Sequence, residues 1–166
     1  MLGRSLLVLL LVAGVVMASS GARAEPGADG RSGGELDGFA IGHVPSGAGD
    51  AVSDFDYEWG RVAFSSRVWE RRVDGGYRVD LTVAVLRGER LRDLDALREF
   101  LAEYHERDPD AWALEPFRHG EHRGHITDGQ AFWLVEPGLA VSVRLDAGRF
   151  GRGELTRTAL GVRRVE

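Results

Sequence analysis

The clearest pattern along the chain is an alternation of apolar and polar residues between Tyr77 and Val85. A period of two places every second side chain on the same side of an extended chain, so this stretch predicts a strand whose odd-numbered residues face a core. The preceding stretch RVAFSSRVWERR also keeps apolar residues on one parity, and the Asp74-Gly75-Gly76 sequence between the two is typical of a turn. Together the two stretches predict a β-hairpin.

The next segment, DLDALREFLAEYHERD, changes to a helical period. Its leucines and aromatic residues recur every three or four positions, which predicts an amphipathic helix that packs on the sheet. Either Asp93 or Asp95 can cap the N-terminus of this helix, and Pro109 ends it.

Two tight turns divide the rest of the chain. Asp128-Gly129 suits a two-residue hairpin and Pro137-Gly138 suits a type II turn, so three antiparallel strands are expected around them. A short helix over 154–160 and a terminal extended piece follow. The predicted fold class is α+β: an antiparallel sheet of about five to six strands, with one main helix and a short C-terminal helix packed on one face.

The N-terminus has the layout of a secretory signal peptide. A basic residue, an apolar run over 6–18 and an Ala22-Arg23-Ala24 sequence predict cleavage after Ala24. The apolar run is shorter than the roughly 20 residues that cross a bilayer, so an uncleaved anchor is the less favoured alternative. Residues 25–37 are expected to form a flexible leader and residues 38–166 a single domain, with no membrane span in the mature chain.

The composition removes several classes of function. The chain contains no cysteine, no lysine and no asparagine. Without cysteine it has no disulfide, no thiol nucleophile and no thiolate metal ligand, and without lysine it cannot form a Schiff base. The absence of both lysine and asparagine, whose codons are rich in A and T, indicates a GC-rich genome, and we expect an actinobacterial source.

The net charge makes nucleic acid an unfavourable partner. The chain has 21 basic and 26 acidic residues, a balance of −5. Loss of residues 1–24 removes two arginines and no acid, which leaves 19 basic against 26 acidic residues, or −7. A negatively charged chain with scattered arginines attracts neither nucleic acid nor an anionic membrane surface.

Two stretches resemble known proteins. The segment GHITDGQAFWLVEPGLAVSVRLDAGRFGRGELTRTALGVR is similar to the closing part of small extracytoplasmic α+β domains of unknown function. The stretches VSDFDYEWGRVAFSSRVWERR and RGERLRDLDALREFLAEYHERDPDAW resemble secreted actinobacterial proteins of unknown function. The likeness covers most of residues 50–163 and implies an extracytoplasmic α+β domain. It implies no catalytic residue.

The segment HGEHRGH is the first candidate for chemistry, because it places His119, His122 and His125 three residues apart. Zinc requires three or four ligands that converge at about 2 Å. On a continuous strand His119 and His125 would share a face about 20 Å apart and His122 would face the other way. A bend at Gly120 or Gly124 could bring two of them together, so a metal site and solvent-facing histidines both remain open.

Other candidates are weaker. The stretch DFDYE has the alternating oxygens that calcium favours, but it lacks the glycine and the distant glutamate of an EF-hand loop. None of the serines after residue 24 lies in a G-x-S-x-G sequence. No motif indicates a cofactor.

The second face of the sheet is the favoured site. Residues of the parity opposite to the core should form an open surface of arginines and one aromatic, which could bind an anionic or amphipathic ligand or a partner protein. The predicted site residues are Arg67, Trp69, Arg78, Asp80, Thr82, Ser142 and Arg144. The predicted function is a secreted, non-enzymatic binding domain, and the alternative is a small metal-dependent or histidine-dependent hydrolase that uses the His119–His125 segment.

Overall fold

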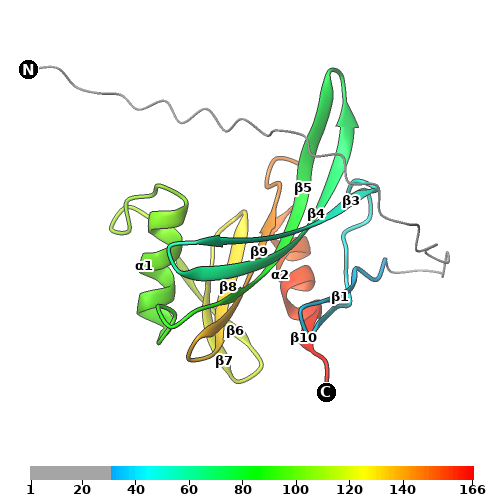
Figure 1. The fold of residues 1–166 in the computed structure, drawn as a ribbon. Helices are drawn as coiled ribbons and strands as arrows, with labels where there is room; N and C mark the ends of the chain where they lie inside the picture. Colours follow the sequence, from blue (N-terminus) through cyan, green and yellow to red (C-terminus); the bar gives the residue numbers. More distant parts are fainter. Residues whose placement is uncertain (1–30) are drawn as a thin grey trace, which may run out of the picture.

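The structure is a computed structural model that describes residues 31–166, which form two antiparallel sheets and two helices (Figure 1). The larger sheet has the strand order β3 (Ala51–Trp59), β4 (Val62–Val73), β5 (Gly76–Arg87), β9 (Leu139–Leu145), β8 (Gln130–Glu136), β7 (His122–Ile126), β6 (Glu115–His119). The smaller sheet has the order β1 (Gly34–Leu36), β2 (Phe39–Ile41), β10 (Val162–Arg164). Helix α1 spans Leu94–Tyr104 and helix α2 spans Arg152–Gly161.

The predicted α+β class with an antiparallel sheet is confirmed. The main sheet has seven strands, whereas five to six were expected. The acidic stretch at 51–59 forms one strand, and the histidine-containing stretch at 115–126 forms two. The predicted hairpin is β4–β5, and Gly75 in its turn has a φ of 85°. Asp93 is the N-cap of α1, where its side chain accepts a hydrogen bond of 2.8 Å from the Ala96 amide.

The two helices pack on opposite faces of the main sheet, which differs from the prediction that both cover one face. Alternate residues of β5 show this directly. Val83 and Val85 belong to the cluster that contains α2 and the small sheet, whereas Ala84 and Leu86 belong to the cluster that contains α1. We call the two sides of the main sheet the α2 face and the α1 face.

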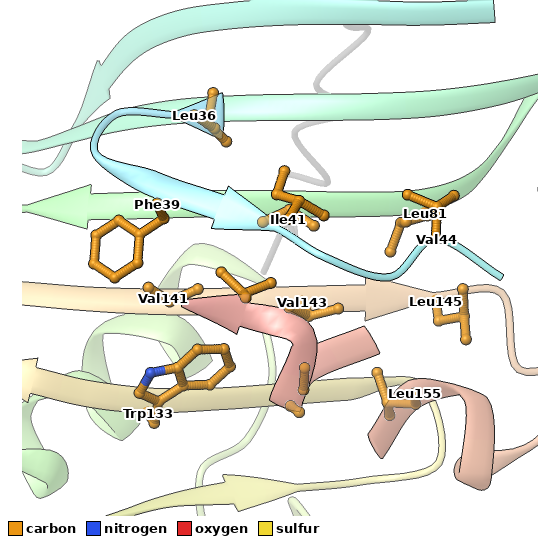
Figure 2. Close-up of a cluster of buried hydrophobic side chains, with 14 of the residues drawn as sticks. Leu36, Phe39, Ile41, Val44, Leu81, Trp133, Val141, Val143, Leu145 and Leu155 are labelled. Carbon is orange, nitrogen blue, oxygen red and sulfur yellow. The ribbon is translucent and has the colours of Figure 1, made fainter. Parts of the chain in front are cut away.

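The α2 face is closed by apolar side chains. The small sheet and α2 lie across β5, β9 and β8, and their side chains meet those of the main sheet (Figure 2). Trp133 at the centre is only 1% exposed, and Ile41, Val141 and Leu155 around it are fully buried. This packing is the larger of the two cores and stabilises the sheet through the burial of apolar area.

A β-bulge interrupts the alternation of β5. Leu81 pairs with Trp69 and Val79 pairs with Glu70, so Asp80 between them has no cross-strand partner. One extra residue reverses which side chains face which side of the sheet. Tyr77 and Val79 therefore leave the core that the sequence pattern predicted for them, and they are 55% and 48% exposed.

The small sheet begins inside the segment predicted to be a flexible leader. Residues 34–36 form β1, which a turn at Asp37-Gly38 joins to β2. Both turn residues have positive φ, 45° and 80°, the conformation that Asp-Gly adopts in a two-residue hairpin. The domain thus includes residues 31–37, and the leader prediction is wrong for them; the predicted signal peptide and residues 25–30 lie outside the described residues. No helix within residues 31–166 is long and apolar enough to cross a membrane.

Candidate functional site

The three histidines of HGEHRGH do not converge. A turn at Gly120, with a φ of 60°, joins β6 to β7 and makes His119 and His122 cross-strand partners. Their ring centroids are 6.4 Å apart, and His119 stacks on Trp133 at 4.5 Å on the α2 face. His125 lies on the α1 face, 5.5 Å from the ring of Phe132. On one continuous strand His119 and His125 would share a face. The turn instead places His119 beside His122 and leaves His125 on the opposite face.

This arrangement gives no support to the predicted metal site. Burial lowers the pKa of both His119 and His125, as expected for imidazoles packed against aromatic rings. Within residues 31–166, no three side chains among His, Cys, Asp and Glu are placed so that they could hold a metal ion. The acidic residues of DFDYE serve the edge of the sheet instead, where Asp54 binds Arg67 and Asp56 accepts a hydrogen bond from Ser65.

Two predicted site residues lie on the α2 face. Trp69 is 5% exposed and belongs to the α2-face core. Arg67 donates two hydrogen bonds to the Asp54 carboxylate, of 2.7 and 2.6 Å, and a third to the Gly33 carbonyl. The prediction that these residues share an open face with Thr82 is wrong, because the small sheet covers this part of the α2 face.

Asp80 is a buried structural residue and not part of an open surface. Its carboxylate, fully buried as a side chain, accepts hydrogen bonds from Arg71 and from the Gly49 amide, each of 2.9 Å, and forms an ion pair with Arg149. Burial raises the pKa of Asp80, but these donors outweigh it, so its net pKa is lowered. Arg78 lies in the exposed part of β5 before the bulge, paired in register with Arg71. Asp80 therefore lines the groove beside Thr82 with its carboxylate already engaged, and Arg78 does not line that groove.

The other predicted site residues, Thr82, Ser142 and Arg144, lie together on the α1 face. Thr82 pairs with Arg144 across β5 and β9, and Ser142 lies two residues further along β9. Beside them is an open groove of about 1100 Å³ between the sheet and the segment after α1. The residues that line the groove include Val79, Thr82, Arg107, Trp112, Gln130 and Arg144.

The groove leaves two arginines without an acidic partner. Its acids Glu115 and Asp128 both face Arg152, at 2.7 and 3.9 Å. Asp146 faces Arg71 at 3.7 Å, Asp80 is paired as described, and Asp108 accepts a hydrogen bond from the Asp110 amide. In residues 31–166, by contrast, no carboxylate oxygen lies within 4.0 Å of Arg144 or Arg107. The guanidinium of Arg107 instead lies 5.5 Å from the ring centroid of Trp112.

A hydrogen-bond network connects the groove to the end of α1. Gln130 is 4% exposed, and its side-chain nitrogen donates to Ser142 Oγ at 3.0 Å and lies 3.1 Å from His105 Nε2. An amide N–H can donate to that imidazole nitrogen only when the imidazole is neutral. Burial, followed by the charges of Arg144 and Arg107, lowers the pKa of His105 to about 4. At physiological pH the site therefore combines a neutral histidine with two arginines, Arg144 and Arg107, that have no carboxylate partner among residues 31–166.

Sequence reasoning missed His105, Gln130, Trp112 and Arg107. His105 directly follows α1 and is partly buried, a position that by itself indicates no function. Gln130 is 25 residues further along the chain. No local pattern indicates that the two side chains meet, because the contact depends on how α1 lies on β8.

The fold and groove define an antiparallel α+β domain with a groove of mixed charge on one face, in which Arg144 and Arg107 have no acidic partner among the described residues. No protein-family model, curated protein or solved structure matches the chain. A role for the groove must therefore be argued from its own residues.

Proposed function

We propose that this chain is a secreted, non-enzymatic domain that binds a small anionic ligand in the groove on its α1 face. The observation that carries the proposal is the pair of groove arginines, Arg144 and Arg107, without a carboxylate partner in the described part of the chain. The acids around them are already engaged by other arginines or by backbone amides.

The chemistry of the groove favours a ligand with both a charged and an apolar part. Arginine binds carboxylate, phosphate and sulfate groups through paired N–H donors. Trp112 and the half-exposed Val79 add apolar surface beside these charges. Such clefts, apolar with a few convergent polar groups, are the common form of small-molecule sites.

Secretion is supported by the N-terminal pattern, with its apolar run and small residues before Glu25. The hydrolase alternative gains no support, because His119 and His125 lie on opposite faces of the sheet. The neutral His105 is held by Gln130 and has no serine hydroxyl within hydrogen-bond distance among the described residues. Binding without chemistry is the function that the groove supports best.

The proposal is tested by titrating the ¹⁵N-labelled protein with four six-carbon probes: hexanoate, hexyl sulfate, hexanol and hexyltrimethylammonium. We expect the two anions to shift the amide signals of Thr82, Gln130 and Arg144, with binding that weakens as salt is added. The neutral and cationic probes should produce no such shifts.

The matched variants are Arg144→Gln with Arg107→Gln, against Arg118→Gln with Arg123→Gln. Arg118 and Arg123 are exposed and paired with each other in register on β6 and β7, so both double variants change the net charge equally. Loss of hydrogen bonds to a charged group weakens binding about tenfold or more. We expect this for the groove variant only; equal weakening in both, or no anion binding by the unaltered protein, would contradict the proposed function.

A further inference from the structure

A small recess lies at the inner end of the groove, between the end of α1 and the main sheet. Thr82 and Arg144 line both the groove and the recess. The recess has a volume of about 40 Å³. A water molecule needs a cavity of about 10–15 Å³, so the recess is large enough for a small polar group.

The recess contains a hydroxyl that has no partner. Ser66 on β4 is 4% exposed; its Oγ is close to the Tyr57 hydroxyl but has no partner at full hydrogen-bond geometry among the described residues. A buried hydroxyl without a partner costs on the order of 1–3 kcal/mol relative to a bonded one. The position of Ser66 in the wall of the recess means that a bound polar group could remove this cost.

The other polar groups of the recess are also donors. Ser142 Oγ accepts its hydrogen bond from Gln130 and keeps its own proton free. The hydroxyls of Tyr57 and Tyr104 are 2.8 Å apart, so one of the two protons is used between them. Thr82 adds a further hydroxyl, and the guanidinium of Arg144 adds a positive charge at the junction with the groove.

None of the carboxylates in residues 31–166 lines the recess, in contrast to the groove outside it. Its ionisable side chains are Arg144, the two tyrosines and the neutral His105. A cation would therefore find no counter-charge there. A planar anion of three non-hydrogen atoms fits both the size and the donors, and a carboxylate group is such an anion. A sulfate or phosphate head has five non-hydrogen atoms or more and matches a space of this size less well than a carboxylate does.

We propose that this recess binds the carboxylate of a small ligand, while the rest of the ligand lies in the groove. This inference rests on the proposed function and adds to it the chemical identity of the anionic group. Arg144 pairs with the carboxylate at the junction, and Ser66 and Ser142 donate to its oxygens. Charge-assisted hydrogen bonds of this kind are what make a partly buried anion stable.

The test compares hexanoate with hexyl sulfate on Ser66→Val, Ser66→Ala and Ser65→Ala. Ser66→Val fills the recess and removes the donor, and Ser66→Ala removes the donor alone. Ser65 is the matched control, because it lies next in the chain and its hydroxyl is bonded to Asp56 outside the recess. Dissociation constants come from the same NMR titration, and the amide spectrum reports whether each variant keeps its fold.

We expect Ser66→Val to weaken hexanoate binding by tenfold or more, and Ser66→Ala to weaken it by about fivefold. Hexyl sulfate should change by less than twofold in both, and Ser65→Ala should change neither probe. In the unaltered protein, binding of hexanoate should also move the ring signals of His105. If Ser66→Val does not fold, Ser66→Ala with the His105 signals decides the question.

Unchanged hexanoate binding in the Ser66 variants would overturn this inference. Should the double arginine variant still lose the anion in that case, the ligand stays in the outer groove and the proposed function stands. If the Ser66 variants weaken hexanoate and hexyl sulfate binding equally, the recess does not hold the carboxylate. Ser66 then affects binding only by supporting the structure of the groove. If neither anion binds the unaltered protein, both proposals fail together.

Discussion

The two faces of the seven-stranded sheet differ in how completely they are covered. On the α2 face, a helix and a second sheet bring apolar side chains onto the main sheet, and Trp133 among them is 1% exposed (Figure 2). On the α1 face, a single helix of 11 residues, about 16 Å long at 1.5 Å per residue, covers only part of the sheet (Figure 1). The groove begins where that helix ends.

The difference indicates why polar residues gather on the α1 face. Thr82, Ser142 and Gln130 occupy sheet positions that would be apolar under a longer helix. Two of them, Ser142 and Gln130, are buried and bonded to each other, so the polar groups are satisfied locally as burial requires. The α2 face supplies stability, and the uncovered end of the α1 face supplies the site.

The test with the largest expected effect compares the stability cost of removing one tryptophan from each face. We expect Trp133→Ala to lower the free energy of unfolding by about 4 kcal/mol, because it leaves a cavity in closely packed surroundings. Trp112→Ala, in the α1-face core at the wall of the groove and 8% exposed, should cost less, about 3 kcal/mol, because water from the adjoining groove can fill part of the space that the ring leaves. Urea unfolding measures both; equal losses would show that the two faces are equally filled.

A second test concerns the bulge that ends the site. Asp80→Ala removes the carboxylate that binds Arg71, Arg149 and the Gly49 amide. We expect a loss of about 3 kcal/mol in the free energy of unfolding, since the change leaves buried donors without a partner. Asp56→Ala, an exposed carboxylate with one bond to Ser65, serves as the control and should cost about 0.5 kcal/mol. Similar losses for the two would contradict the structural role of Asp80.

The smallest expected effect is the pH dependence that the α1 face introduces. The pKa of His105 is about 4 in the folded protein and about 6.5 in an unfolded chain. Between these values the unfolded chain holds a proton that the folded protein lacks, so stability falls as the pH drops from about 6.5 towards 4. Because the imidazole is partly exposed, we expect about 1 kcal/mol at pH 5 from this residue.

Two measurements check the pH effect. The ring signals of His105 should titrate near pH 4, and the Arg144→Gln, Arg107→Gln double variant should raise that pKa, because both positive charges contribute to lowering it. His105→Gln should reduce the loss of stability between pH 7 and pH 5 but leave the part that comes from His119 and His125. A titration of His105 near its ordinary pKa would remove the argument for a buried, neutral imidazole.

Much of the local structure was predictable from the sequence. The odd residues Leu81, Val83 and Val85 face a core as their alternation predicts, and they are fully buried. The prediction failed before Leu81, because one bulged residue at Asp80 reverses the alternation and a period cannot show a single insertion. Asp37-Gly38 is a sequence typical of a two-residue hairpin turn, and both residues have positive φ. The glycine-rich composition around it favoured a flexible leader instead.

The candidate site was only partly predictable. Thr82, Ser142 and Arg144 were placed on one face correctly, because their parity along β5 and β9 is a local property. Arg67 and Trp69 were assigned to the wrong face, because the alignment of β4 against β5 depends on cross-strand register. His105 and Gln130 meet only through the packing of α1 on the sheet.

The sequence by itself determined the elements: the hairpins with their Gly-containing turns, the helix capped by Asp93, and the α+β class. Each of these depends on interactions between residues a few positions apart, which leave a period or a turn motif in the chain. Only the tertiary structure decided that the helices cover opposite faces, that Asp80 is buried among arginines, and that Arg144 and Arg107 have no acidic partner in the described part of the chain. Those outcomes depend on which distant side chains share a face and exclude water, and a one-dimensional pattern does not contain that information.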